Sequence, residues 1–457
     1  MDAEVESLKH ATIKEKLELM LDIGQLMMES GSDSKSIVRD MLRAAAYLGL
    51  HWKHINFHMT YTTIMVNYDN ETEAYTIYRK CRRHGINMSA IIDVSRVSWR
   101  AIEKKYVIQA FKAELDRIRQ EEQTRHYSPL VTSIAAGFAC GGFCKLFGCD
   151  WAAFFYTALA ACFGFWGRRW CNLLGVNSYI STAAAACVAT IAAYFTSFLP
   201  GSATPWFPMI ACMLFLVPGI PLINSFDDLM NNYALSGATR AIHTLLIVFA
   251  MTFGIVCAIS VCDVPHYAAY SIVPSGLDGS QAIAAAVAAM GFSVIFNIPP
   301  KLLPVVAVGA IIAVGTRNIL SLGFGMSQAW ASFMGAAVMG IIGYKFAHWI
   351  HVPHMVVTIP AVIPMIPGVL MYRLLIGLFD ITALNPQDFL GAMQAGVKSF
   401  LIIFAIAVGA TIPEMLAHQC IERSKQRRLQ RMLAASRGSQ ESMFETETDI
   451  DQASNLK

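Results

Sequence analysis

The sequence has 457 residues, of which 55% are hydrophobic and only 15% are charged. Soluble domains carry about 25% charged residues, so this composition excludes an ordinary soluble protein, and a net charge of +3 does not suggest a nucleic-acid partner. Residues 1–127 hold 37 of the 67 charged residues, whereas residues 128–418 hold 17. This pattern predicts a water-soluble front domain, a long membrane body and a charged tail over residues 419–457.

The first 127 residues are predicted to form a small soluble α/β domain. Residues 1–13 are polar and acidic, without the basic start and apolar run of a signal peptide, so this domain is expected in the cytoplasm. Apolar spacing and β-branched runs predict, in chain order, helices 14–29 and 34–49, strands 55–68 and 88–95, and a charged helix 99–125. Residues 30–33, Ser-Gly-Ser-Asp, are expected to end the first helix and cap the second.

The remainder predicts an all-α polytopic membrane protein with about ten transmembrane helices. A span needs about 20 mostly apolar residues. The candidates are 128–148, 150–166, 178–200, 206–226, 238–261, 280–299, 301–320, 327–350, 354–379 and 390–413. They group into membrane regions 128–262 and 280–418. Lys and Arg precede the first span and follow the last, whereas the loops near 200–205, 262–279 and 380–389 have none, so both termini are predicted to be cytoplasmic.

The membrane body shows signs of duplication. Gly167-Arg168-Arg169 corresponds to Gly315-Thr316-Arg317, and Val217-Pro218-Gly219 corresponds to Ile366-Pro367-Gly368, at offsets of 148 and 149 residues. Five spans in each half force the second half to enter the membrane upside down. The expected fold is therefore two inverted five-helix repeats, as in many secondary transporters.

Corresponding helix breaks mark the expected substrate path. Proline removes a backbone donor and glycine permits non-helical angles, so both free backbone groups to bind a ligand. The break residues are Pro218, Gly219 and Pro221 in the first half, and Pro364, Pro367 and Gly368 in the second. An ordinary kink is the alternative for each break.

Ionisable and amide side chains near these breaks are further candidates for the path. They are Asn224, Asp227, Asp228, Arg240 and Arg373. Such groups inside spans commonly serve transport, although Asp227 and Asp228 could equally lie in a solvated surface loop. No metal or cofactor site is expected, and the sequence has no Walker A, GxSxG or HExxH motif.

Several stretches resemble the threonine/serine exporter family. They are LMMESGSDSKSIVRDMLRAAAYLGL, HMTYTTIMV, LVPGIPLINSFDDLMNNYALSGATRA and GFSVIFNIPPKLLP. The Pro-Gly pair, Asp228, Ser236-Gly237 and Arg240 match the family pattern, whereas Asn231 stands where glycine is expected. In some bacteria the two halves are separate proteins linked to succinate export, and this chain resembles a fused form. The resemblance implies ten spans, a bacterial inner membrane, and export of small polar molecules driven by the proton motive force.

Two classes of function remain open from the sequence. The first is a transporter of threonine or serine, or alternatively of a succinate-like dicarboxylate, in which Arg240 and Arg373 would matter most. The second is a membrane-embedded enzyme or sensor with a cytoplasmic input domain. The clustering of ionisable residues at one break favours a carrier over an enzyme. Its partners would be a small-molecule substrate, protons and the lipid bilayer, with a homo-oligomer possible.

Overall fold

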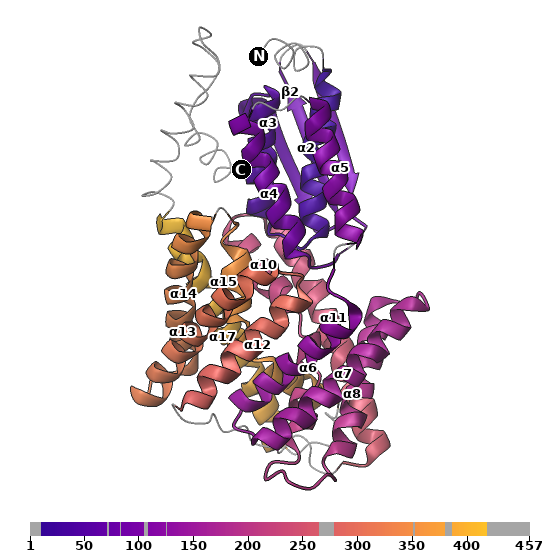
Figure 1. The fold of residues 1–457 in the computed structure, drawn as a ribbon, viewed down its shortest axis with the longest axis vertical. Helices are drawn as coiled ribbons and strands as arrows, with labels where there is room; N and C mark the ends of the chain where they lie inside the picture. Colours follow the sequence, from indigo (N-terminus) through magenta and orange to yellow (C-terminus); the bar gives the residue numbers. More distant parts are fainter. Residues whose placement is uncertain are drawn as a thin grey trace.

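The structure is a computed structural model that describes residues 11–70, 73–82, 84–104, 108–124, 126–264, 278–350, 352–379 and 386–417. Residues 11–124 form an α/β layer, here called the N-terminal unit, which lies at one end of the helical bundle formed by residues 129–417 (Figure 1). The predicted tail, 419–457, lies outside the described residues.

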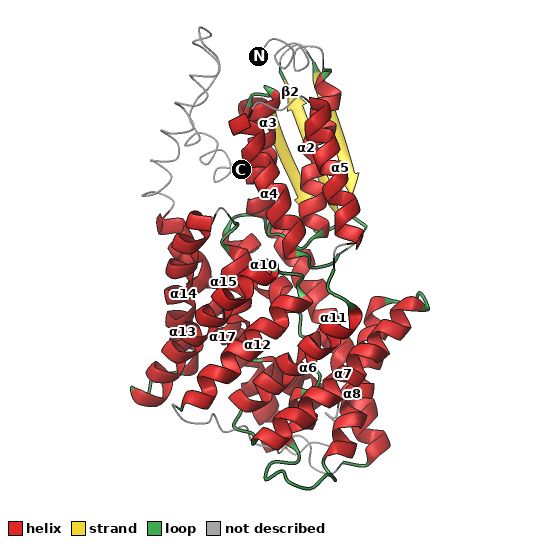
Figure 2. Ribbon diagram, viewed as in Figure 1, coloured by secondary structure: helices red, strands yellow, loops and turns green. Residues whose placement is uncertain are grey.

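The N-terminal unit places helices over one face of a three-stranded antiparallel sheet of order β1-β2-β3 (Figure 2). Helix α2 packs on β2 and β3 and also contacts α3, α4 and α5. The elements are α2 (Ile13–Glu29), α3 (Ser34–Leu48), η1 (Trp52–His54), β1 (Ile55–Thr60), β2 (Thr63–Asp69), β3 (Ala74–Lys80), α4 (Met88–Lys104) and α5 (Ile108–Thr124).

Alternating burial along β2 fixes which face of the sheet meets the helices. Ile64, Val66 and Tyr68 are buried, and their neighbours in the strand are less so. The predicted cap at the start of α3 is confirmed, because the side chain of Asp33 accepts from Ser36 N at 2.8 Å. The α2 N-terminus carries a capping box formed by Thr12 and Glu15.

The prediction of a strand at 88–95 is wrong, because these residues begin helix α4. The β-branched residues of that short window favoured a strand. The burial of Met88, Ile91, Ile92, Ser95 and Ser98 instead follows helical spacing.

The predicted strand 55–68 is two strands, β1 and β2, joined at Tyr61-Thr62. Pairing Met59 with Ile64 and Thr60 with Thr63 makes them a tight hairpin. The third strand, β3, was not predicted.

The helical bundle follows the predicted spans closely in position. Its elements are α6 (Pro129–Leu146), α7 (Trp151–Leu173), α8 (Ser178–Thr196), α9 (Phe207–Ala211), η2 (Leu214–Leu216), α10 (Gly219–Met230), α11 (Ala234–Cys262), α12 (Gly279–Ile295), η4 (Pro300–Leu302), α13 (Leu303–Asn318), η5 (Ile319–Gly323), α14 (Gln328–Ile350), α15 (Met355–Val362), η6 (Ile363–Met365), α16 (Gly368–Phe379) and α17 (Pro386–Ala417). A tight turn follows α12, with Asn297 at φ +57°.

The helices of the two halves pack in the same order. In the first half α6 packs on α7, α7 on α8, α8 on α11 and α11 on α10; in the second half α12 packs on α13, α13 on α14, α14 on α17 and α17 on α16. The halves meet where α6 packs on α12, and also where α10 contacts α17 and α16 contacts α11. The last two helices of the first half, α10 and α11, therefore contact the last two helices of the second half, α17 and α16.

By length and apolar composition, fewer of the described helices qualify as membrane spans than the ten that the sequence predicts. Among the described residues, six helices are long and apolar enough to cross a membrane, or up to eight when each of two bent pairs counts as one span. The bent pairs are α9–η2 with α10 and α15–η6 with α16. These helices make the chain a polytopic membrane protein, whereas ten spans remain a prediction.

Glycines set the closest helix contacts in the bundle. A Cβ added at Gly254 of α11 would clash with the Ala183 carbonyl oxygen of α8, and one at Gly409 of α17 would lie 2.5 Å from the Phe333 carbonyl oxygen of α14. Backbone atoms cannot rotate away as the tip of a side chain can. Small residues therefore allow these helices to approach closely, as is common in membranes.

We expect Gly254→Leu to lower the free energy of unfolding by about 1–3 kcal/mol or more, the range typical of overpacking. The physical reason is that α11 can accommodate the new side chain only by moving away from α8. Melting temperature and the yield of monodisperse protein in detergent measure this. Gly315→Leu is the control, because a Cβ there has nothing within 4 Å. Equal stability of the two variants would contradict the prediction.

Candidate functional site

Both predicted helix breaks are present, and they have the same local geometry. In each bent pair the two helical segments meet at 57°. Gly219 N donates to Val217 O at 2.8 Å, and Gly368 N donates to Ile366 O at 2.9 Å. Pro218 has φ −78° and ψ 65°, the angles of an inverse γ-turn. A 3-10 turn, η2 or η6, precedes each break. The breaks are therefore sharp turns rather than gentle proline kinks.

The two breaks pack against one another at the centre of the bundle. A Cβ added at Gly219 would lie 2.9 Å from Ile366 Cδ1, and one at Gly368 would lie 2.9 Å from Leu214 Cδ2. Each glycine thus makes room for a side chain that precedes the opposite break.

The cavity between the breaks is small and apolar. Its volume is about 10 Å³, and Phe143 and Phe292 line it together with residues from both breaks. About 10–15 Å³ is the least space that holds one water. The space between the breaks is therefore too small to hold an amino acid.

Asp228 lies in a second, separate site at the junction between the N-terminal unit and the bundle. It follows Gly219 by nine residues on α10, or about 14 Å along the axis at 1.5 Å per residue. Its carboxylate accepts from Ser34 N at 2.7 Å and from Ser236 Oγ at 3.0 Å, while Ser34 Oγ donates to Ser236 Oγ at 2.8 Å. The carboxylate thus caps the start of α3, where the helix dipole favours negative charge.

Arg240 of α11 completes this junction. Its Nε lies 3.3 Å from Asp228 Oδ2, without hydrogen-bond alignment, and its Nη2 donates to Ser32 O at 3.0 Å. The exposed fractions of the Arg240 and Asp228 side chains are 1% and 0%. Asp228 and Arg240 therefore form a buried ion pair, and their burial rules out a solvated surface loop for Asp228.

The remaining predicted residues fall at several places around these two sites. Asn224 belongs to the junction, where its Nδ2 donates to Gly31 O at 2.9 Å. Asp227 is also buried, but it faces α17, where Thr411 Oγ1 donates to its Oδ1 at 3.0 Å. Pro221 lies in the first turn of α10, and Pro364 is buried in η6. Arg373 is half-buried on α16. The structure therefore divides the predicted site between the breaks and the junction.

Sequence reasoning missed the residues on the N-terminal side of the junction. Gly31 has φ +88°, and an added Cβ would lie 2.9 Å from the Gly85 carbonyl oxygen, so glycine is required there. Ser32 and Ser34 flank the helix cap Asp33. The sequence identified residues 30–33 only as the end of one helix and the cap of the next. The serine and glycine residues next to the helix cap could have marked this segment as a candidate site. Nothing in the sequence indicated that Ser34 would bind Asp228, which lies 194 residues away.

Aromatic and histidine side chains cover Arg240 at the same junction. The Arg240 guanidinium carbon lies 5.1 Å from the ring centre of Tyr61, at the tip of the β1–β2 hairpin. The His84 ring stacks on Tyr61 at 4.2 Å, and the His243 ring lies 6.2 Å from His84. Tyr179 Oη lies 2.6 Å from His243 Nδ1. The hairpin tip is thereby fixed to α11, which Tyr179 links in turn to α8.

Low pH should weaken the contact between the β1–β2 hairpin tip and helix α11. Burial, and then His243 and Arg240, lower the pKa of His84, with Glu29 acting in the opposite direction. A released His84 then binds protons more readily than a docked one, so docking loses stability as pH falls below about 6.5. We expect protection of the Ser34 amide against hydrogen exchange, corrected for intrinsic rates, to fall between pH 7.5 and pH 5.5. His84→Phe, which keeps the ring but cannot titrate, should flatten the curve; an unchanged curve would remove His84 as the cause.

The helical bundle contains two matched helix breaks, and the N-terminal unit binds the helix that begins at the first of them. This arrangement is typical of a multi-pass membrane transporter. Residues 18–262 match the family model described as "Putative threonine/serine exporter", and residues 281–416 match the model described as "Threonine/Serine exporter, ThrE". The chain belongs to the threonine/serine exporter family, with both halves of the family in one chain. No solved structure matches it.

Proposed function

We propose that this protein exports threonine or serine by alternating access, driven by the proton motive force. The observation that carries the proposal is the pair of matched breaks packed against one another, since broken helices at the interface of two halves are where secondary transporters bind substrate. The closed cavity between Gly219 and Gly368 would be the occluded centre of the path. Opening of one half against the other would expose freed backbone groups of residues 217–219 and 366–368 to the substrate.

The proposed membrane arrangement is ten spans in two inverted five-helix repeats. Two helices, α7 with Arg168 and Arg169, and α12 with 17 residues, would join the six long helices and two bent pairs as spans. The shared packing order of the two halves supports the repeat. Inversion would also place Arg317 on the opposite side of the membrane from its counterpart Arg169. In this arrangement the protein lies in a bacterial inner membrane with both termini, and the domain 1–127, in the cytoplasm.

The N-terminal unit is proposed to gate the cytoplasmic entrance. Residues 31–34 bind the Asp228 end of α10, whose other end forms the first break. A rigid helix of 12 residues therefore connects the junction to the proposed path. Docking of the N-terminal unit would hold the first break in its present position, and release would free it.

Uptake into everted membrane vesicles tests the proposal. Export by a protein with cytoplasmic termini becomes uptake in such vesicles. With an imposed pH gradient, acid inside, we expect labelled threonine and serine to accumulate, and collapse of the gradient to stop accumulation. Succinate is included because the Arg373 guanidinium of α16 could bind an anion. Arg240 is the weaker candidate for this role, because it is already paired with Asp228. Accumulation of succinate alone would favour the dicarboxylate alternative, and accumulation of none of the three would contradict the proposal.

A further inference from the structure

The N-terminal unit also binds the second half of the bundle, at the turn between α12 and α13. Asn297 Nδ2 donates to Asn87 Oδ1 at 2.8 Å, and Met88 N donates to Phe296 O at 2.9 Å. All four residues are buried. We call these two hydrogen bonds the latch contact. Since the junction binds α10 and α11 of the first half, the N-terminal unit is attached to both halves of the bundle.

The junction and the latch contact use neighbouring parts of the N-terminal unit in the same way. Ser34 and Met88 are the first residues of α3 and α4, where a backbone N–H has no partner within its own helix. The Ser34 amide donates to a carboxylate of the first half, and the Met88 amide donates to a carbonyl of the second. Asn87 N donates to Ser30 O at 3.0 Å. The N-terminal unit therefore bridges the two halves through two helix starts that are linked to each other.

The two contacts differ in charge. The junction contains Asp228 and Arg240, whose side chains are 0% and 1% exposed, and separating them would leave buried charges without their partners. The latch contact, as defined above, joins neutral amide and carbonyl groups. Neutral hydrogen bonds exchange with water at a small net cost. Of the two contacts, the latch contact therefore opens more easily.

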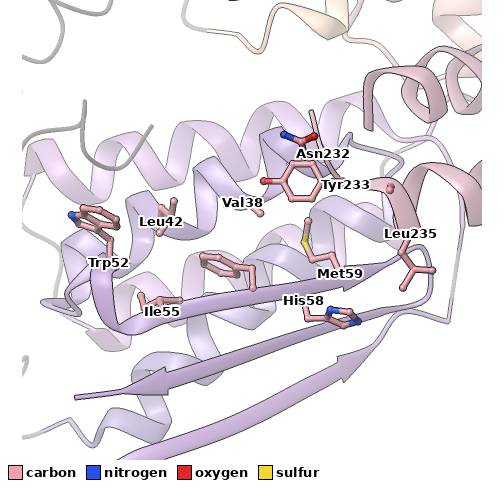
Figure 3. A pocket seen from close by; sticks show the side chains of 11 residues that line it. Val38, Leu42, Trp52, Ile55, His58, Met59, Asn232, Tyr233 and Leu235 are labelled. Carbon is pink, nitrogen blue, oxygen red and sulfur yellow. The ribbon is translucent and has the colours of Figure 1, made fainter. Parts of the chain in front are cut away.

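The packing beside the junction leaves the N-terminal unit room to move. A cavity of about 250 Å³ lies between this unit and the first half, with Val38, Leu42 and β1 on one side and the α10–α11 turn on the other. In Figure 3, Tyr233 of this turn lies over strand β1. The N-terminal unit can therefore tilt about the junction without first displacing closely packed side chains at this place.

We propose that the latch contact opens in each transport cycle while the junction stays closed, and that this opening sets the rate of export. The inference rests on the proposed function, because alternating access moves one half of a transporter against the other. A single unit bound to both halves resists that movement, so one of its contacts must open. Asn87 and Asn297 are therefore positioning residues that regulate the path from outside it.

Asn297→Gly tests the proposal in the full-length protein, because glycine accepts the φ of +57° at this position and removes the side-chain bond to Asn87. We expect the initial rate of threonine uptake into everted vesicles to rise about threefold to tenfold, the range for one hydrogen bond. Tyr127→Phe should also raise the rate, because Tyr127 Oη donates to Ile298 O of the same turn at 2.7 Å. Asn232→Gly is the matched control, since Asn232 has φ +65° and is exposed, and its rate should equal that of wild type.

Hydrogen exchange distinguishes the latch contact from the junction and does not require transport. After correction for intrinsic rates, we expect the Met88 amide to be less protected than the Ser34 amide in wild type, because the latch contact opens while the junction stays closed. Asn297→Gly should lower the protection of Met88 about threefold to tenfold and leave Ser34 unchanged. Equal changes at both amides would show that the N-terminal unit leaves the bundle as one piece, which would overturn the proposal.

A reversible cross-link tests whether opening is necessary. Asn87→Cys with Asn297→Cys, joined by a reducible bifunctional thiol reagent, should stop threonine uptake, and a reductant should restore it. Wild type has eleven cysteines, so wild type treated with the same reagent is the control and should stay active. Normal uptake by the cross-linked variant would contradict the inference. If wild type takes up neither threonine nor serine, the proposed function fails, whereas hydrogen exchange still decides whether the latch contact opens separately.

Discussion

Asp228→Asn should abolish export and release the N-terminal unit from the bundle while leaving membrane insertion intact. The substitution leaves the Arg240 guanidinium buried, at 1% exposure, without its carboxylate. Breaking a buried pair in this way costs about 3–5 kcal/mol, which is more than a hundredfold in a docking equilibrium. Vesicle transport measures the first effect, and hydrogen exchange at Ser34 measures the second.

A double variant separates the two roles that Asp228 could have. Asp228→Asn with Arg240→Gln removes both charges but keeps amide groups that can accept from Ser34 N and donate toward Ser32 O, so no charge stays buried without a partner. If Asp228 only fastens the N-terminal unit, docking and export should both return. If it handles charge during transport, docking should return without export. Asp388→Asn, at an exposed position in α17, is the matched control. Normal export and docking by Asp228→Asn would remove this residue from the mechanism.

Gly219→Leu combined with Gly368→Leu should reduce export to background in a protein that still folds. Each new side chain would occupy the space now filled by Ile366 or Leu214 of the opposite break. These neighbours are the flexible ends of side chains, so we expect a stability loss of about 1–3 kcal/mol for each substitution rather than unfolding. The breaks would then be unable to close on one another, and alternating access requires that closure.

The single variants and one control make this test specific. Gly219→Ala and Gly368→Ala add only a Cβ, and we expect them to keep most of the export activity because Ile366 and Leu214 can rotate. Gly391→Leu on α17 adds the same bulk where nothing lies within 4 Å, and it should transport normally. Full export by the double leucine variant would show that contact between the breaks is not part of the transport cycle.

Prediction succeeded best where the chemistry is local. The Pro-Gly pairs at 218–219 and 367–368 were identified as breaks because proline and glycine act on their own backbone. The cap at Asp33 was identified for the same reason. Residues 88–95 were misassigned because the same β-branched residues suit a strand or a helix. There the helix is stabilised by packing against α2 and α3, which a short window does not contain.

The sequence by itself determined that this is a membrane protein with a charged front segment, and it located one pair of Pro-Gly helix breaks. Apolar length, charge distribution and spacing report such features directly. Only the tertiary structure showed that Asp228 and Arg240 bind residues 31–34 and do not lie at the breaks. The partner of a buried charge depends on which residues are close in space, and the sequence does not give that. A cavity beside the junction is likewise lined by residues of β1, α3 and the α10–α11 turn, which no sequence pattern brings together.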